Sequence, residues 1–271
     1  MSLLDRLSRS GVVKTTLTLI VYAFYAAVLG ASCAPSAVLL VWAFSRFLLP
    51  VMVAGGIAAS VFVANVVLFS LLVGAAAFVF YFSGLLLMGS LIRVFSLGVK
   101  PGRHEPASLP VLLWIVLNGV WTMAFRLILP MVPMTPLSQM FHRLSGCRIG
   151  KNVWINSINL VDCYMISIGD NTVIGGDAVL SAHVFENGHL LIQRITIGKN
   201  CLIGAYSYIS PGVTIGDGSV IGMKAYVRKG KQIPPGTRMT SVAGLPYSRA
   251  LDLERGTFGR RRAGIRSPAS L

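Results

Sequence analysis

The second half of the chain carries a six-residue repeat. A period of six is neither the 3.6-residue period of a helix nor the two-residue alternation of a strand. It predicts a parallel β-helix, in which each hexad forms a short strand and a turn, and three hexads close a triangular coil of about 18 residues. The grid consists of Ile149-Gly150, Ile168-Gly169, Ile174-Gly175, Ile197-Gly198, Ile203-Gly204, Ile215-Gly216 and Ile221-Gly222, with Ile155, Val161, Leu180, Ile209, Val227 and Ile233 filling the gaps.

The aliphatic residue of each hexad is expected to point into the prism and to stack on its counterpart one coil away. The Gly, Asn or Asp that follows is expected to tolerate the conformation of the turn. The register is interrupted twice: the spacing is seven residues from Val161 to Ile168, and seventeen from Leu180 to Ile197. The first interruption predicts a one-residue bulge. The second contains "AHVFENGHL" and predicts a loop that leaves the prism.

The first half of the chain is strongly apolar. Over the whole chain 54% of residues are hydrophobic, 12% are charged, and the mean hydropathy is +0.72. A bilayer-spanning helix needs about 20 apolar residues, and the run from Gly55 to Arg93 is nearly forty residues without an internal charge. We therefore predict transmembrane helices within the apolar segments 12–32, 36–53, 55–93 and 110–129.

Basic residues flank the apolar half and favour the cytoplasm. They precede its first segment at Arg6, Arg9 and Lys14, and follow its last at Lys151. Both ends should face inward, which makes the number of crossings even. The basic loop around Lys100 leaves two alternatives. If it also faces inward, 110–129 lies along the membrane interface; if it faces outward, 110–129 is a crossing. The sequence thus allows two or four crossings of the inner (cell) membrane, with the β-helix in the cytoplasm.

The domain organisation follows from these patterns: a transmembrane helical region over 1–135, a β-helix over 136–248 and a basic tail over 249–271. The net charge is +15, and the tail holds many of the arginines. No nucleic-acid-binding motif accompanies them, so membrane lipid headgroups or a solubilising role are the alternatives. The cysteines form no CxxC pair, which favours reduced thiols over disulfides or a zinc site. They are Cys33, Cys147, Cys163 and Cys201.

The hexad array with its loop, together with "ISPGVTIGDGSVIG" and "IPPGT…AGLPYS", resembles the hexapeptide-repeat acyltransferases over roughly residues 145–250. Membrane spans followed by a β-helix carrying "H-x-x-E-x-G-x-L" resemble, over most of the chain, the membrane-anchored acyltransferase-like domains at the end of poly-lysine-type peptide synthetases. The resemblance implies a left-handed β-helix and a homotrimer with active sites between neighbouring prisms. It also implies transfer of an acyl group from coenzyme A to a hydroxyl or amine.

His183 matches the catalytic histidine of that family. An imidazole, with a pKa near 6.5, suits the removal of a proton from the attacking group at neutral pH. Glu186 could orient the ring through its second nitrogen, or could be a surface carboxylate. Asp162 lies about one coil earlier and could line the same site, or could be a turn aspartate. His189, at the far side of the loop, is expected to contact the substrate or to be structural.

The donor implied by the resemblance is acetyl-CoA or another acyl-CoA, and no metal is expected. Main-chain groups of small turn residues would hold the pantetheine arm, and basic side chains would bind the phosphates. The family's closing G-x-P-A-R, which packs on the adenine end, is matched here only by "GLPYSR". The candidate donor-binding residues are Gly204, Ala205, Gly222, Lys224, Arg228, Lys229, Pro246 and Arg249.

Several other functions are compatible with parts of the sequence. A β-helical carbonic anhydrase would need three histidines on one zinc ion, but the repeats hold only His183 and His189. A sugar nucleotidyltransferase would need a nucleotide-binding α/β domain, for which the apolar half leaves no room. Two alternatives remain open: peptide-bond formation by an amine attacking an aminoacyl thioester, and a non-catalytic trimeric membrane scaffold. The favoured function is a membrane-anchored acyltransferase acting on a small-molecule or lipid-linked acceptor near the membrane.

Overall fold

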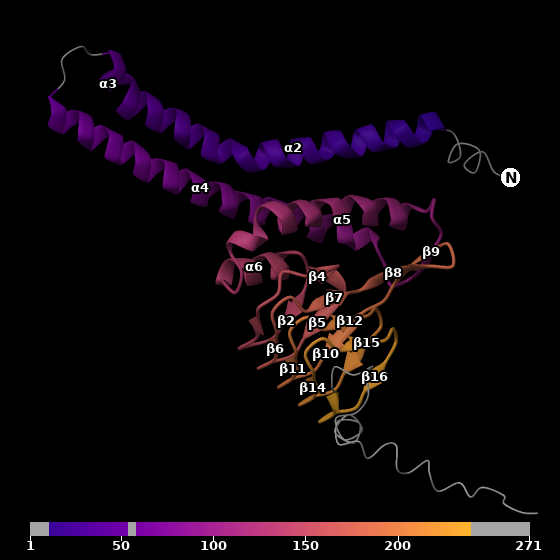
Figure 1. The fold of residues 1–271 in the computed structure, drawn as a ribbon. Helices are drawn as coiled ribbons and strands as arrows, with labels where there is room; N and C mark the ends of the chain where they lie inside the picture. The colour runs from indigo at the N-terminus through magenta and orange to yellow at the C-terminus, as the bar shows by residue number, and fades with distance from the viewer. Residues whose placement is uncertain (1–10, 54–57, 240–271) are drawn as a thin grey trace, which may run out of the picture. The chain divides into compact units, whose positions relative to one another are not determined.

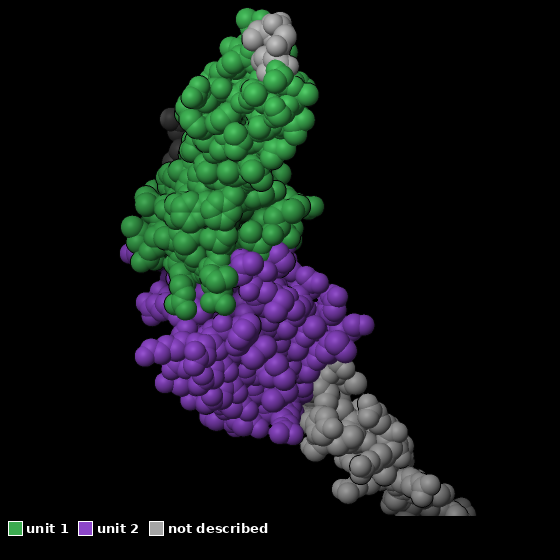
Figure 2. Space-filling model, turned by 90° about the vertical axis from the view of Figure 1, so that its left-hand side faces the viewer, with its two compact units in different colours: residues 1–99, 107–132, 136–145 green, residues 100–106, 133–135, 146–271 purple. Residues whose placement is uncertain are grey.

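The computed structural model describes residues 11–53 and 58–239. The chain separates into two compact units, coloured in Figure 2. Unit 1 comprises residues 1–99, 107–132 and 136–145; unit 2 comprises 100–106, 133–135 and 146–271. Residues 136–145, grouped with the repeats by sequence, are therefore part of the helical unit. The short segment 100–106 joins the repeats, although it comes from the apolar half.

Unit 1 is helical in its described part. Helix α2 (Gly11–Ala43), the π-helix η1 (Phe44–Leu48) and α3 (Leu49–Val53) form one helical run. Segments 12–32 and 36–53, considered separately in the sequence, therefore lie on the same run, which includes Pro35 and Pro50. Helix α4 (Ala59–Phe95) runs back beside it (Figure 1). Then follow η2 (Ser96–Gly98), α5 (Leu109–Leu127), η3 (Leu129–Met131) and α6 (Pro136–Leu144).

Three helical stretches in the described part are long and apolar enough to cross a membrane. They are Thr18–Val53, Ala59–Gly98 and Leu109–Met131. The first two have 36 and 40 residues, and 6% of the most apolar 18-residue window is buried in each. The third has 23 residues, and 33% of its window is buried. All three are therefore candidates for a crossing by length and composition, and the third differs from the other two in being more buried within the protein.

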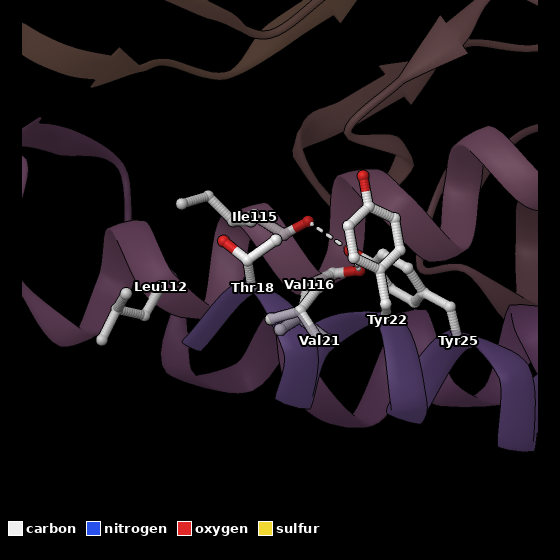
Figure 3. A pocket seen from close by; sticks show the side chains of 7 residues that line it. All are labelled: Thr18, Val21, Tyr22, Tyr25, Leu112, Ile115 and Val116. Carbon is white, nitrogen blue, oxygen red and sulfur yellow. Dashed lines mark hydrogen bonds between the residues drawn. The ribbon is translucent and has the colours of Figure 1, made fainter. Parts of the chain in front are cut away.

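Helices α2 and α5 line an open apolar pocket of about 340 Å³ in unit 1 (Figure 3). The Tyr25 hydroxyl at its edge donates to the Ile115 carbonyl oxygen over 3.0 Å. Gly119 makes this approach possible, because a β-carbon at that position would overlap the tyrosine ring. The lining residues are Thr18, Val21, Tyr22, Tyr25, Leu112, Ile115 and Val116.

Unit 2 contains a β-helix of two- and three-residue parallel strands, one per hexad. The first sheet joins β2 (Arg148–Ile149), β5 (Ile166–Ile168), β10 (Ile195–Ile197), β13 (Thr214–Ile215) and β16 (Gln232–Ile233). The second joins β3 (Trp154–Ile155), β6 (Val173–Ile174), β11 (Leu202–Ile203), β14 (Val220–Ile221) and β17 (Arg238–Met239). The third joins β4 (Leu160–Val161), β7 (Val179–Ser181), β12 (Tyr208–Ile209) and β15 (Tyr226–Val227). The parallel sheets and the hexad spacing fit a left-handed β-helix.

The aliphatic hexad residues stack inside the prism as predicted, with one exception in β4. There Leu160, not Val161, is fully buried and pairs with Leu180, while Val161 is partly exposed and pairs with Ser181. Ile149, Ile168, Ile197, Ile215 and Ile233 are paired strand to strand along the first sheet, and each is at most 7% exposed. Burying a full aliphatic side chain contributes roughly 1.5–3 kcal/mol, so a column of this kind gives the prism its cohesion.

The glycine after the isoleucine has a different role from the one expected. The left-handed backbone positions of the turns are held by other residues, such as Asn171, Asn200 and Gly218, whereas Gly204 is not among the residues of positive φ. Its requirement is close packing: a β-carbon on Gly204 would lie 2.5 Å from the carbonyl carbon of Gly222 one coil below. Glycine is needed there because neighbouring coils touch through their backbones.

Both interruptions of the repeat have structural counterparts. The extra residue between Val161 and Ile168 is taken up by a 3-10 turn, η4 (Cys163–Met165). The longer gap holds an antiparallel hairpin, β8 (His183–Glu186) and β9 (His189–Ile192). A third strand, β1 (Gly102–His104), pairs with β9 from the other side. The predicted loop is therefore a three-stranded sheet, completed by a segment remote in sequence.

The outward residues differ among the three faces of the prism. The first sheet presents only polar side chains: Arg148, Ser167, Thr196, Thr214 and Gln232. The second presents the apolar column Trp154, Val173, Leu202 and Val220, ending in Arg238. On the third, Val179 is followed by the stacked rings of Tyr208 and Tyr226, whose centroids are 5.6 Å apart.

Candidate active site

The candidate site lies where the chain leaves the third sheet. Asp162 follows β4 in the first coil, and His183 follows β7 in the second, so the register of the sheet brings them together. Asp162 has φ = +60°, a left-handed conformation that aspartate tolerates better than most residues. This residue begins the bulge, so the seven-residue spacing seen in the sequence marks the point where the carboxylate turns toward the histidine.

Asp162 and His183 form a close hydrogen-bonded pair. Nδ1 of His183 lies 2.6 Å from Oδ2 of Asp162. The carboxylate side chain is 4% exposed and the imidazole 20% exposed. A buried carboxylate beside Nδ1 favours the tautomer that carries its proton there, so that the Nδ1–H donates to Asp162 and the lone pair of the neutral ring lies on Nε2. This is the arrangement of a base with its orienting carboxylate.

Tyr164 adds a second contact to the same carboxylate. Its hydroxyl donates to Oδ1 of Asp162 over 3.4 Å. Burial, and then the neighbouring charge of Asp162, raise the pKa of the Tyr164 phenol. The phenol therefore stays protonated and remains a donor, which helps to satisfy a carboxylate that is almost removed from water. Tyr164 was not predicted from the sequence; its position in the bulge after Asp162 was the available signal.

Glu186 does not lie beside a ring nitrogen of His183, where an orienting role would place it. Its carboxylate accepts from the Lys229 ammonium, with Nζ 2.5 Å from both oxygens. Asp162 instead occupies the position beside Nδ1 of His183. Both members of the Glu186–Lys229 pair are partly exposed, at 39% and 43%. The pair links the hairpin to the turn after β15, and it gives Lys229 a partner within the protein.

His189 is held by the strand β1. Its Nε2 lies 2.7 Å from Oε1 of Glu105, and its Nδ1 lies 2.8 Å from Nη2 of Arg103. With the proton on Nε2, the ring donates to the carboxylate and accepts from the guanidinium. The Asn187 carbonyl oxygen lies 2.7 Å from Nδ1 and can accept from it only when Nδ1 carries a proton, so it is not a hydrogen-bond partner in this tautomer. These contacts give His189 a structural role in joining β1 to the hairpin, and neither Arg103 nor Glu105 carried a sequence signal for it.

The expected donor-binding residues are spread along the turns of the last coils. Gly204, Ala205 and Gly222 lie where successive turns stack on each other. Lys224 and Arg228 are exposed cations, and Lys224 has φ = +60°. Pro246 and Arg249 lie outside the described residues, as does the basic tail. The described residues contain no cluster of three or more His, Cys, Asp or Glu side chains that could hold a metal ion.

All four cysteines are free thiols. Cys163 is buried directly after Asp162, and burial raises the pKa of its thiol well above the ordinary value. A protonated, buried thiol is a poor nucleophile, so this residue belongs to the support of the site.

Comparison with known proteins places the β-helix in a known class of repeat. Residues 194–229 match the family model described as "Bacterial transferase hexapeptide (six repeats)", and residues 165–187 match "Hexapeptide repeat of succinyl-transferase". The resemblance drawn from the sequence is thereby confirmed for these residues, which carry hexapeptide repeats of the kind found in bacterial transferases.

Two curated relatives share parts of the chain. Galactoside O-acetyltransferase of Escherichia coli (strain K12) is 40% identical over 77 residues, which are 26% of this chain and 38% of that protein. Delta-poly-L-ornithine synthetase of Acinetobacter baumannii (strain AB307-0294) is 25% identical over 115 residues, 40% of this chain and 9% of that protein. The chain thus spans well under half of either relative.

Solved structures with partial similarity include a galactoside acetyltransferase in complex with coenzyme A. It is 27% identical, covers 46% of this chain and 74% of its own, and has a TM-score of 0.36. A hexapeptide-repeat-containing acetyltransferase from Vibrio cholerae O1 biovar eltor, complexed with acetyl coenzyme A, is 20% identical. It covers 53% of this chain and 90% of its own, with a TM-score of 0.41.

Proposed function

We propose that this protein is a membrane-anchored acyltransferase that moves an acyl group from coenzyme A to a hydroxyl or amine, with His183 as general base. The observation that carries the proposal is the Asp162–His183 pair, 2.6 Å apart, at the point where a hexapeptide-repeat prism extrudes its hairpin. The matching curated relative that is 40% identical is a galactoside O-acetyltransferase, which supports an acetyl group and a hydroxyl acceptor.

The chemistry follows from the protonation state of the pair. Nε2 of His183 accepts the proton of the acceptor as its oxygen or nitrogen attacks the thioester carbonyl. The Asp162 carboxylate stabilises the imidazolium that forms, and Tyr164 stabilises the carboxylate. When the carbon–sulfur bond breaks, the imidazolium returns the proton to the departing thiolate. The products are the acylated acceptor and free coenzyme A thiol, and the enzyme ends in its starting state.

The donor would bind along the last coils. The turns at Gly204, Ala205 and Gly222 offer main-chain groups to the pantetheine arm, and the exposed Lys224 and Arg228 offer charge to the phosphates. Lys229 is paired with Glu186, so its contribution to the donor site would be to hold the hairpin in place. Pro246 and Arg249 remain candidates for the adenine end.

The outward faces of the prism support a homotrimer with the site between protomers. Two of the three faces carry apolar or aromatic columns and the third is polar. A cyclic assembly uses two different faces of each subunit, one for each neighbour. In such a ring the column headed by Trp154 would pack against the tyrosine face of the next protomer, next to His183, and the polar face would remain in water.

The apolar helices support anchoring in the cell membrane. The stretches Thr18–Val53 and Ala59–Gly98 exceed the length that a bilayer requires. The basic residues beside the helices favour a cytoplasmic β-helix. An anchor of this size indicates an acceptor presented at the membrane surface, either lipid-linked or a small amphiphile.

The test is thiol release from acetyl-CoA by the purified full chain with candidate acceptors. His183→Ala should lower the rate by roughly 10²- to 10⁴-fold, the usual contribution of a general base. Thr214→Ala, on the polar face of the prism, is the matched control and should retain the rate. A His183→Ala enzyme as active as the control would refute the assignment, and absence of thiol release from both would favour the scaffold.

A second candidate is transfer of an aminoacyl group to an amine. The observation that favours it is the 115-residue match to the Delta-poly-L-ornithine synthetase. In this reaction the Asp162–His183 pair would remove a proton from the attacking amine. Replacing acetyl-CoA by an aminoacyl thioester in the assay separates the two, since only one donor should support His183-dependent thiol release.

A further inference from the structure

The strand β1 belongs to the β-helix unit, although it lies in sequence between α4 and α5. Gly102, Arg103 and His104 pair antiparallel with Ile192, Leu191 and Leu190 of β9. The side-chain contacts of His189 with Glu105 and Arg103 strengthen the same connection. Leu190 and Ile192 are fully buried. β1 is therefore an integral strand of the hairpin sheet, and the hairpin begins at His183.

This pairing constrains the path of the chain through a membrane. After α4 the chain forms β1, which must lie on the same side of the bilayer as the β-helix because it pairs with β9. The chain therefore enters α5 from that side. After α5, residues 133–135 and everything from 146 onward again belong to the β-helix unit. Both ends of α5 are thus on the same side. Resting on the membrane anchoring proposed above, but not on the catalytic activity, we infer that α5 does not cross the bilayer and lies along its β-helix-side surface.

The residues of α5 suit an interfacial position. Its buried residues are spaced three or four apart on one face: Val111, Trp114, Leu117, Val120 and Ala124. Elsewhere the helix exposes apolar Leu109, Ile115 and Leu127 together with polar Thr122 and Arg126. Such a mixture matches the boundary between headgroups and acyl chains, where apolar side chains face the lipid and basic ones face phosphate.

The charge around α5 points to the same partner, an anionic lipid surface. Glu105 is the one acidic residue between positions 91 and 150, and it is engaged by His189. The basic residues Arg93, Lys100, Arg103, Arg126 and Arg143 are all exposed. Basic residues are attracted to an anionic membrane surface, so their concentration here favours the cytoplasmic leaflet.

The number of crossings then follows. With α5 on the surface, the crossings come from the run α2–α3 and from α4, which gives two.

Single cysteines in the full chain test the inference. In a background with the four native cysteines replaced by alanine, four exposed positions are used: Ala107→Cys before α5, Met134→Cys after it, Lys231→Cys on the β-helix and Ala58→Cys before α4. A membrane-impermeant maleimide is applied to right-side-out and inside-out vesicles. Positions 107, 134 and 231 should react from one side and position 58 from the other, with at least a tenfold preference each.

Reaction of position 107 from the side of position 58 would overturn the inference, because α5 would then cross. Reaction of position 107 only after detergent would overturn it equally, because the segment would lie inside the bilayer. Extraction of the protein by alkaline carbonate would instead refute membrane anchoring itself. An Arg103→Cys/Leu191→Cys pair that fails to cross-link in membranes would remove the premise that β1 pairs with β9.

Discussion

The Asp162–His183 pair is the residue-scale feature on which the chemistry depends, and it distinguishes two carboxylates. Asp162→Asn should lower kcat/KM on the order of 10²- to 10⁴-fold, because an amide can present its N–H to Nδ1 and favour the wrong tautomer. Glu186→Gln should cost less than tenfold, because it removes a partly exposed pair with Lys229, and such pairs contribute about 0–1 kcal/mol. Steady-state thiol release measures both.

The two variants are matched in chemistry, since each replaces a carboxylate with its amide. A larger loss in Glu186→Gln than in Asp162→Asn would transfer the orienting role to Glu186. Circular dichroism of both variants checks that the prism is intact.

His142 in α6 gives a prediction on pH. It is fully buried, and burial lowers its pKa from 6.5 to about 4. Between pH 4 and pH 6.5 His142 is therefore protonated in the unfolded chain but neutral in the folded chain. The free energy of unfolding consequently falls as the pH drops from about 6.5 to about 4. The loss amounts to roughly 3 kcal/mol at about 1.4 kcal/mol per pKa unit.

Thermal unfolding of the detergent-solubilised protein across this pH range measures the effect. His142→Gln, which cannot titrate, should show a flatter dependence than the parent even if its stability at pH 7 is lower. Equal slopes in the two proteins would contradict the prediction.

At the residue scale the sequence proposed candidate side chains but not how they combine. His183 was a candidate because it matches the catalytic histidine of the family that the sequence resembles, and Asp162 because it lies about one coil earlier. The pairing itself depends on the register between β4 and β7, and on the left-handed backbone at Asp162. Neither is visible in a residue count, so Glu186, three residues from the histidine in sequence, was an equally reasonable partner.

At the scale of elements, the hexads predicted strands, coils and both interruptions, because each hexad is a local pattern that repeats in space. The hairpin sheet was beyond such reasoning. β1 has three residues and no alternation, and its partner lies more than eighty residues away. Long-range pairing of so short a strand is decided by the contacts it makes, here those of Arg103 and Glu105 with His189.

Those contacts predict a measurable role for β1 in holding the hairpin. Arg103→Ala combined with Glu105→Gln removes both side-chain partners of His189 while the backbone pairing remains. Exposed charged contacts of this kind contribute roughly 0.5–1 kcal/mol each, so the loss of two should increase opening of the hairpin about five- to thirtyfold. Hydrogen exchange of residues 183–192 reports this directly, and Lys100→Ala is the neighbouring control of like charge. Unchanged exchange would show that backbone pairing alone holds the sheet.

On the scale of the whole molecule, composition separated the apolar half from the repeats but did not fix the number of crossings. Two and four were both compatible with the basic flanks, because the side on which Lys100 and Arg103 lie was unknown. Segment 100–106 belongs to the β-helix unit, and the inference that α5 does not cross rests on this membership. In the inferred topology the number of crossings depends on a strand pair in the other unit, which explains why hydropathy alone leaves that number open.

The three faces of the prism allow the assembly to be tested within a single coil. Thr196, Leu202 and Tyr208 are outward residues on the first, second and third sheets of the same coil. If the apolar and tyrosine faces pack against neighbours, an aspartate there places an unpaired charge in an interface, which costs several kcal/mol. Leu202→Asp and Tyr208→Asp should therefore shift the protein toward monomers and lower activity, whereas Thr196→Asp, on the polar face, should leave both unchanged.

Light scattering of the detergent-solubilised full chain measures the mass, corrected for bound detergent. Dissociation by Thr196→Asp, with Leu202→Asp and Tyr208→Asp both remaining associated, would mean that the polar face is the contact surface. The face beside His183 would then be open to solvent, and a site shared between protomers would be ruled out.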